Sequence, residues 1–277
     1  MELWVTEYQT PSLGLSCKVT ATLRSEQTKF QHLAVVDTVQ YGRMLLLDGM
    51  VQTTDQDEFV YHEMISRVAL NSHPRPARVL IIGGGDGGTL REVTKHPGVE
   101  KGTLVEIDER VVQASRDFFP GLSASFNSAR AEVVIADGIE FVKSRPDSFD
   151  VVIVDSTEPV GPARQLFSAD FYRNVFRALH DDGMLVVQSE SPFLNPDVIQ
   201  MAYRGIAAFF PTTRLYLASI PTYPSGLWSF TIGSKQYNPE EPRGEEVPTG
   251  RYYTPDVHRA SFNLPSFVKK ILEQVEM

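Results

Sequence analysis

VLIIGGGDGG, at residues 79–88, joins an uninterrupted apolar run to a glycine-rich loop. Gly83, Gly85 and Gly88 have the G-x-G-x-x-G spacing of a nucleotide-binding turn. This pattern predicts a buried strand, a tight turn and a helix that begins at the turn. Asp86 lies inside the loop, where the pyrophosphate of a dinucleotide would bind. The spacing alone therefore leaves the kind of nucleoside open.

Apolar runs of strand length recur after this loop, and segments with helical periodicity separate them. The expected strands of this series are 79–83, 102–108, 132–137, 149–155 and 183–189. Their alternation with helices predicts an α/β fold with a mostly parallel sheet and helices on both faces. Two further strands, 214–220 and 227–233, have no helix between them, which predicts an antiparallel edge.

The spacing of hydrophobic residues changes along the chain and separates two regions. Residues 1–54 alternate and are rich in β-branched side chains, with an Asp48-Gly49 dipeptide that is typical of a hairpin. From Asp55 onward the period becomes helical. We therefore expect an N-terminal β-strand domain, 1–54, and a catalytic domain, 55–277. The first domain is too short to bury much surface alone, so it should pack on the second or on a partner subunit.

Composition excludes several classes of protein. The 277 residues carry a net charge of −9 and a single cysteine, Cys17, so an intrachain disulfide and a cysteine metal cluster are excluded. The acidic balance argues against nucleic acid as a partner and permits a cationic substrate. Without a signal peptide or an apolar run of about 18 residues, we expect no membrane association and a cytoplasmic location.

Acidic residues end four consecutive expected strands or follow them closely. They are Asp86, Glu106 with Asp108, Asp137, and Asp155 with Glu158. The carboxyl ends of parallel strands share one rim, where ligands bind. Any one of these aspartates could simply cap a helix. Four in succession predict an anionic crevice.

Asp86 favours one class of nucleoside. Its carboxylate near a pyrophosphate would cost several kcal/mol at intermediate dielectric. A cationic nucleoside, such as S-adenosylmethionine or its relatives, would be stabilised by the same charge. Glu106, about 20 residues beyond the loop, is suited to hydrogen-bond a ribose diol. Asp137 and Gly138 are placed to read the adenine amino group.

Two later stretches are candidates for the acceptor site. VIVDSTEPVGP, 152–162, brings Asp155 to the rim as a candidate general base, with Glu158 as an anchor for a cation. The alternative is that Asp155 and Ser156 only cap a turn. IPTYPSGLW, 220–228, offers an aromatic wall for a diamine, although core packing would also explain Trp228.

Four stretches together resemble the polyamine aminopropyltransferases, the family of the bacterial spermidine synthases. They are LLLDGMVQTTDQDEFVYHEM, VLIIGGGDGG, VDSTEPVGP and IPTYPSGLW. The resemblance implies a Rossmann-like, methyltransferase-type sheet behind the β-domain. It implies transfer of an aminopropyl group from decarboxylated S-adenosylmethionine to putrescine, giving spermidine and 5′-methylthioadenosine. It also implies no prosthetic group, no metal, and a homodimer or homotetramer.

The resemblance also implies roles for individual residues, with Asp155 as the proton acceptor. The residues implied to bind the nucleoside co-substrate are Gln31, Gly83, Gly85, Asp86, Glu106, Asp137, Gly138 and Pro162. Those implied to bind the amine and aminopropyl groups are Trp4, Tyr61, His62, Asp86, Asp155, Ser156, Thr157, Glu158, Tyr223 and Trp228. Many family members have aspartate in place of Glu158, so putrescine, cadaverine, agmatine and spermidine all stay open as acceptors.

Direct displacement suits these residues. A sulfonium is already a good leaving group, and the sequence has no H-E-x-x-H and no G-x-S-x-G motif. Three alternatives stay open: a methyltransferase on the same scaffold, a sensor that binds nucleoside or polyamine without catalysis, and a nicotinamide oxidoreductase. Asp86 argues against the third, and against the first because intact S-adenosylmethionine carries a carboxylate.

Overall fold

The computed structural model describes residues 2–157, 161–243 and 247–275 and contains two β-sheets. The first sheet is antiparallel, in the order β1-β2-β3-β4-β5. Its strands are β1 (Leu3–Thr10), β2 (Leu13–Gln27), β3 (His32–Thr38), β4 (Gly42–Leu47) and β5 (Met50–Thr54). Asp48 and Gly49 both have positive φ, 50° and 82°, as the hairpin between β4 and β5 requires. The predicted hairpin is confirmed, while β1 lies in a stretch to which the sequence analysis assigned no individual strand.

The second sheet has seven strands in the order β11-β12-β10-β9-β6-β7-β8. They are β6 (Arg78–Gly83), β7 (Lys101–Glu106), β8 (Ala131–Ile135), β9 (Phe149–Asp155), β10 (Leu179–Gln188), β11 (Thr212–Ser219) and β12 (Leu227–Ser234). Strands β6 to β10 are parallel, and β12 runs antiparallel to both β10 and β11. The predicted antiparallel edge is confirmed, with β12 inserted between its two neighbours.

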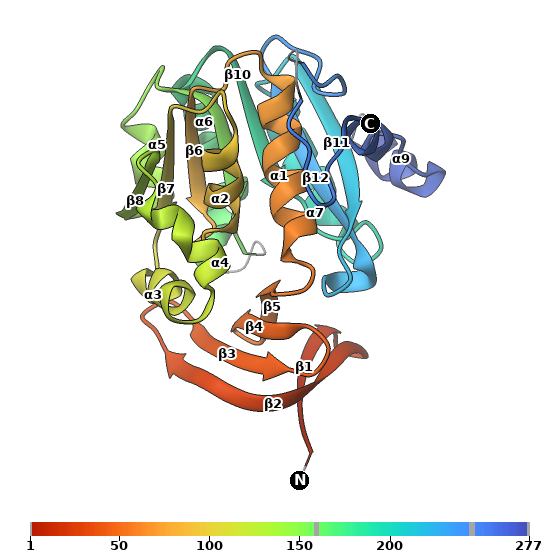
Figure 1. The fold of residues 1–277 in the computed structure, drawn as a ribbon. Coiled ribbons are helices and arrows are strands. Elements are labelled where there is room, and N and C mark those ends of the chain that lie inside the picture. Colours follow the sequence, from red (N-terminus) through yellow and green to blue (C-terminus); the bar gives the residue numbers. More distant parts are fainter. Residues whose placement is uncertain (1, 158–160, 244–246, 276–277) are drawn as a thin grey trace.

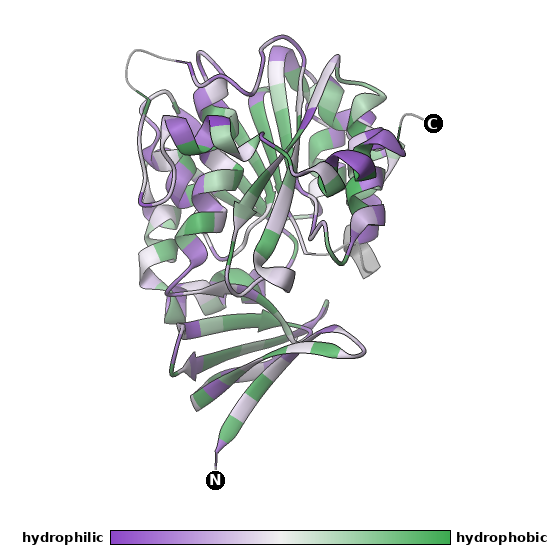
Figure 2. Cartoon of the chain, turned by 90° about the vertical axis from the view of Figure 1, so that its right-hand side faces the viewer, coloured by the Kyte–Doolittle hydropathy of each residue, from purple (hydrophilic) through white to green (hydrophobic). Residues whose placement is uncertain are grey.

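Helices cover both faces of this sheet. The helices are α1 (Glu58–Ser72), α2 (Gly88–Lys95), α3 (Glu109–Phe118), α4 (Pro120–Ser123), α5 (Gly138–Lys143), α6 (Ala169–Ala178), α7 (Pro196–Ala207), α8 (Pro255–Ser261) and α9 (Ser266–Glu273). Helices α1 and α2 pack on the face that includes Ile81 and Ile153, whereas α5, α6 and α7 pack on the face that includes Leu80 and Val152. Figure 2 shows the strands between them as largely hydrophobic, as expected for a sheet that is buried on both sides.

The boundaries of several elements differ from the predicted ones. Strand β10 begins at Leu179, four residues before the predicted start at 183, because Leu179 already pairs with Phe149. Helix α6 therefore ends at Ala178; it begins after Ser168, which caps it by accepting a hydrogen bond from the Phe171 amide. Within the described ranges, no helix is both long enough and apolar enough to cross a membrane.

The N-terminal sheet lies across the carboxyl ends of the larger sheet's parallel strands (Figure 1). Leu33 and Val35 of β3 and Leu45 of β4 pack against α3 and α4, where they contact a cluster that includes Val111 and Leu122. This apolar contact holds the small sheet over the strand ends. The space between the two sheets is therefore where ligand-binding side chains from both can meet.

Candidate active site

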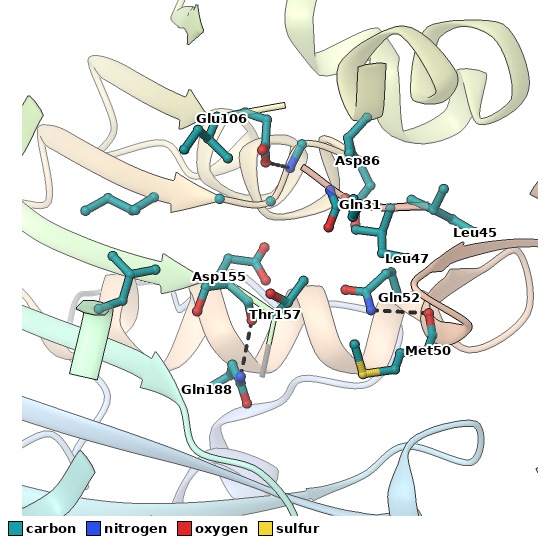
Figure 3. Close-up of a pocket in the computed structure, with 18 of the residues that line it drawn as sticks. Gln31, Leu45, Leu47, Met50, Gln52, Asp86, Glu106, Asp155, Thr157 and Gln188 are labelled. Atoms are coloured by element: carbon teal, nitrogen blue, oxygen red, sulfur yellow. Dashed lines mark hydrogen bonds between the residues drawn. The ribbon is translucent and has the colours of Figure 1, made fainter. Parts of the chain in front are cut away.

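A pocket of about 370 Å³ lies at this junction. Its floor is formed by the carboxyl ends of β6, β7, β8, β9 and β10, and its roof by β4 and β5. Figure 3 shows Asp86, Glu106 and Asp155 on one side and Leu47, Met50 and Gln52 facing them. The strand order reverses between β6 and β9, which is the usual ligand position in an open α/β sheet.

The glycine loop brings its backbone close to two carboxylates. Gly83 and Gly84 have positive φ, 84° and 67°, and the Gly84 amide donates to the Asp155 carbonyl at 2.8 Å. A Cβ at Gly84 would lie 2.6 Å from Asp155 Oδ2, and one at Gly85 would lie 2.8 Å from Glu106 Oε2. Glycine is required here because neither carboxylate leaves room for a side chain.

Asp155 ends β9 and is held by two hydroxyl groups. Tyr61 donates to Oδ1 at 2.6 Å and Thr89 donates to Oδ2 at 2.6 Å. Burial and the nearby Asp86 carboxylate raise the pKa of Asp155 above its ordinary value, an effect that these hydrogen bonds and the His62 cation partly oppose. A half-buried carboxylate of raised pKa that lines a pocket is suited to accept a proton.

Asp86 lies in an ionic row that leads away from the pocket. Its Oδ1 accepts the Gly88 amide at 2.6 Å and lies 3.4 Å from His62 Nε2. The other ring nitrogen of His62 lies 2.5 Å from Glu58 Oε2. Burial disfavours a charged ring, but the two carboxylates outweigh it and raise the pKa of His62 to about 10. His62 is therefore an imidazolium at neutral pH.

Glu106 ends β7 and is 8% exposed. Its carboxylate accepts backbone amides from Gly85 at 3.2 Å and Asp108 at 2.8 Å. Burial and, to a smaller extent, the nearby Asp108 carboxylate raise the pKa of Glu106 to about 7, although the backbone amides oppose this shift. Gln31 lies at the same end of the pocket and donates to Asp108 at 3.2 Å. The ionised Glu106 carboxylate can accept hydrogen bonds from the two hydroxyl groups of a diol.

Asp137 and Gly138 lie at the start of α5. Asp137 caps the helix, because its Oδ1 accepts the Ile139 amide at 2.8 Å, and its side chain is exposed. Gly138 is buried, and a Cβ there would lie 2.4 Å from Ile82 Cγ2. Asp137 thus caps the helix, as one of the two interpretations expects. The residue also lines the pocket.

Three aromatic side chains form a wall at the opposite end. Tyr223 contacts Tyr61 and Trp228, with ring centroids 5.3 Å and 4.8 Å apart. Tyr223 also donates to the Gln52 carbonyl at 2.7 Å, which ties the wall to β5. Asp57 accepts from the Thr222 amide at 3.0 Å and so fixes this loop to the start of α1.

Most of the predicted site residues line the pocket, and four need separate description. Trp4 lies outside it and is 56% exposed, because β1 turns Glu7 toward the pocket and Trp4 to the opposite face of the strand. His62 also does not line the pocket, since its ring lies behind Asp86. Glu158 lies outside the described residues. Pro162 is described only by its backbone, in a 3₁₀ turn.

The structure adds pocket residues that sequence reasoning did not single out. The polar ones include Glu7, Gln52, Gln188 and Glu190, and Thr89 contacts Asp155 from outside the lining. Gln188 donates to the Ser156 carbonyl at 3.2 Å and to Glu190 at 3.2 Å, while Glu190 is fully buried with a positive φ of 70°. The one available signal was an acid, Glu190, just past another strand end.

The lining of the pocket has a single sign of charge. Seven acidic residues line it: Glu7, Asp48, Asp86, Glu106, Asp137, Asp155 and Glu190. Among the described lining residues there is no lysine, arginine or histidine. Such a site attracts cations and repels phosphate and carboxylate groups.

A second group of titratable residues lies at the amino ends of the strands. His73, Asp150 and Asp182 are close enough to share a cation, and His73 Nε2 lies 3.5 Å from Asp182. However, His73 Nδ1 accepts the Arg75 amide at 3.1 Å, which places the proton of the neutral ring on Nε2. The nitrogen that faces the acids therefore has no lone pair to offer.

Comparison with known proteins agrees with this geometry. Residues 58–242 match the spermine/spermidine synthase domain, and residues 3–55 match the spermidine synthase tetramerisation domain. The polyamine aminopropyltransferase of Desulforudis audaxviator is 58% identical over 270 residues, which cover 97% of this chain and 98% of that protein. The Bacillus subtilis polyamine aminopropyltransferase is 49% identical over 275 residues, covering 98% and 99%.

Solved structures are equally similar. A spermidine synthase in complex with the transition-state analogue AdoDATO matches with a TM-score of 0.94 and 43% identity, covering 98% of this chain and 95% of that one. Thermotoga maritima spermidine synthase matches with a TM-score of 0.89 and 42% identity, covering 98% and 94%. The resemblance and the fold class predicted from the sequence are confirmed. The chain is an enzyme that belongs to the spermine/spermidine synthase family, the polyamine aminopropyltransferases.

Proposed function

We propose that this enzyme transfers the aminopropyl group of decarboxylated S-adenosylmethionine to putrescine, giving spermidine and 5′-methylthioadenosine. One observation carries the proposal: the described lining of the pocket has seven acidic residues and no basic one. Both substrates are dications near neutral pH. An intact S-adenosylmethionine would bring an extra carboxylate into this lining, which argues against a methyltransferase.

The nucleoside is proposed to bind across the ends of β6, β7 and β8. Glu106 receives the ribose diol, with Gln31 beside it, and Asp137 with Gly138 receives the adenine edge. Gly83 and Gly85 allow the backbone to approach the thioether region of the nucleoside. Pro162 is assigned to the same part of the binding site from the sequence alone. Asp86 faces the ammonium end of the aminopropyl group.

The acceptor amine is proposed to bind between the aromatic wall and Asp155. Tyr61, Tyr223 and Trp228 contact its methylene chain, and Ser156 with Thr157 lines the entrance beside Asp155. Glu7 and Glu190 are suited to hold the distal ammonium group, because both are buried acids that line the pocket. Glu158 is assigned to the same task by the sequence.

The reaction is a displacement at the carbon next to the sulfonium. An alkyl ammonium of pKa near 10 must first lose a proton, which costs about 4 kcal/mol at pH 7. Asp155 accepts that proton, and the freed nitrogen lone pair forms the new C–N bond. The C–S electron pair returns to sulfur, which leaves as a neutral thioether. Orientation of nitrogen, carbon and sulfur in line supplies the rest of the rate.

Four further expectations stay proposals. We propose a homodimer or homotetramer that forms through the N-terminal sheet, since residues 3–55 match a tetramerisation domain. We also keep the division into domains 1–54 and 55–277, and a cytoplasmic location. The expectation of no metal and no prosthetic group rests on the chemistry, which needs neither.

The decisive test is incubation of the pure enzyme with decarboxylated S-adenosylmethionine and a panel of amines, followed by mass spectrometry. Putrescine should give spermidine and an equal amount of 5′-methylthioadenosine. A higher kcat/KM for cadaverine, agmatine or spermidine would reassign the acceptor. Methyl transfer from intact S-adenosylmethionine, or binding without any product, would reject the proposal.

A further inference from the structure

Behind the pocket, the buried ends of α1 and α2 carry a row of charges that alternate in sign. It begins at Asp86 and continues through His62 and Glu58 to Arg91. Glu58 binds Arg91 with both oxygens, each at 2.9 Å, and binds His62 Nδ1 with one of them at 2.5 Å. Neither Glu58 nor Arg91 lines the pocket.

The geometry determines the charge of the His62 ring. Both ring nitrogens face carboxylate oxygens, Glu58 at 2.5 Å and Asp86 at 3.4 Å. Ionised carboxylates carry no proton to share, so each ring nitrogen is attracted to its carboxylate only when the nitrogen itself is protonated. The His62 side chain is 1% exposed, so solvent screens this attraction little.

We propose that Glu58 is a positioning residue of the aminopropyl transfer: it holds His62 as an imidazolium whose Nε2 faces Asp86. That fixed cation orients the Asp86 carboxylate toward the pocket, beside Asp155. The inference rests on the proposed function for its kinetic consequence, but the charge of His62 can be measured on the protein alone.

Other groups around the ring are consistent with this role. The Tyr61 and His62 rings lie nearly perpendicular with their centroids 5.5 Å apart, and Asp155 is close enough for the imidazolium to lower its pKa. Burial opposes ionisation of Glu58, but His62 and Arg91 outweigh it and lower the pKa of Glu58 to about 2. Glu58 thus keeps its charge across the working range of pH.

On the side away from the pocket, further ion pairs hold Arg91 in place, and Arg91 in turn fixes the position of the Glu58 carboxylate. Arg91 Nε contacts Glu92 at 2.8 Å, and Arg67 contacts Glu92 at 2.6 Å. Arg67 also donates to the carbonyls of Pro248 and Thr249 at 3.2 Å and 3.0 Å. Asp86 is therefore connected by a series of ion pairs to Arg67, which is hydrogen-bonded to a loop outside the pocket.

The test is Glu58→Gln, which preserves shape and removes one charge. Ring ¹⁵N NMR at about pH 8 should show His62 charged in the wild type and largely neutral in the variant, since an ordinary imidazole is neutral there. His62→Gln identifies its signal among the six histidines. Glu240→Gln, at the part-exposed Arg214–Glu240 pair, is the matched control and should leave the signal unchanged.

Kinetics and a double variant separate positioning from general damage. The kcat/KM of Glu58→Gln for the aminopropyl donor should fall roughly 3- to 30-fold near pH 9 and recover as the pH is lowered toward 7, because acid restores the imidazolium. Glu58→Gln with Arg91→Gln removes the stranded guanidinium, which should return part of the charge to His62. A purely structural role would instead make the double variant worse.

The outcomes are distinguishable. A His62 ring that stays charged in Glu58→Gln, or a loss of kcat/KM that is the same at every pH, would overturn the role of Glu58. Absence of turnover in the wild type would instead reject the proposed function, while the measured charge of His62 would still stand.

Discussion

At the scale of single residues, two carboxyl groups of raised pKa serve different ends of the pocket. Asp155 is held by two hydroxyl groups beside the aromatic wall, whereas Glu106 is held by two backbone amides beside the glycine loop. A hydroxyl group can rotate and accept a hydrogen bond once the carboxyl group is protonated, whereas a backbone amide can only donate. The two surroundings thus differ in the way that a proposed base and a proposed binding group require.

Replacement of Asp155 tests the base. Asp155→Asn keeps the size of the side chain but cannot accept the proton, so kcat should fall by about 10² to 10⁴. The measurement is formation of 5′-methylthioadenosine, with donor affinity as the control, which should change little. Turnover near the wild-type value would remove Asp155 from this role.

Glu106 predicts a pH dependence of donor binding. The ionised carboxylate accepts two ribose hydroxyls and the protonated form does not, so affinity should rise with pH and level off above about 7. Calorimetry at pH 6 to 8 should detect protons released on binding. The sign for folding is opposite: because the pKa is raised, this group favours the free folded state below pH 4.5 and loses that contribution as the pH rises to about 7.

Glu106→Gln is the control for that profile. It should bind the donor more weakly at pH 8, and its affinity should no longer vary across this range. Unchanged affinity in the variant would reject the ribose assignment.

At the scale of elements, the turn from β6 to α2 sets the distances in the site. The turn places the backbone of Gly84 directly on the carbonyl of Asp155. Its other end, Gly88, begins α2 against the His62 ring, where a Cβ would lie 2.2 Å from Cε1. The glycines therefore serve contact with neighbouring side chains as much as contact with a ligand.

A pair of glycine substitutions tests this. Gly84→Ala meets both a positive φ and Asp155, so it should lose about 1–2 kcal/mol of stability and most of its turnover. Gly121→Ala, in α4, has no atom within 4 Å of the added Cβ and should keep wild-type stability and activity. Thermal unfolding and initial rates measure both. Equal behaviour of the two variants would contradict the close-approach argument.

At the scale of the whole molecule, the N-terminal sheet contributes side chains to the pocket and exposes aromatic side chains on its other face. Its inner side supplies Glu7 and Gln52 to the pocket. Its other side leaves Trp4 and Tyr8 56% and 76% exposed. Exposed aromatic residues close together on one strand are typical of a surface that a partner covers.

Substitutions on that strand test the proposed oligomer. Trp4→Glu with Tyr8→Glu should lower the mass measured by light scattering, because charges would be buried at the contact. Phe193→Glu, at a residue that is 60% exposed in the larger domain, is the control and should keep the wild-type mass. An unchanged mass in the first variant would place the interface elsewhere.

The sequence by itself determined the parallel sheet, the hairpin at Asp48 and the acids at the strand ends, because hydrophobic period and turn chemistry are local. The tertiary structure alone decided which of these side chains face one another. Glu7 and Glu190 lie 183 positions apart in the chain yet line one pocket, and Trp4 leaves the pocket by strand alternation. The pairing of His62 with Glu58 is local, because the two residues are four positions apart on α1. The pairing of Asp86 with His62 depends on how α1 packs against the glycine loop, and no local pattern encodes that packing.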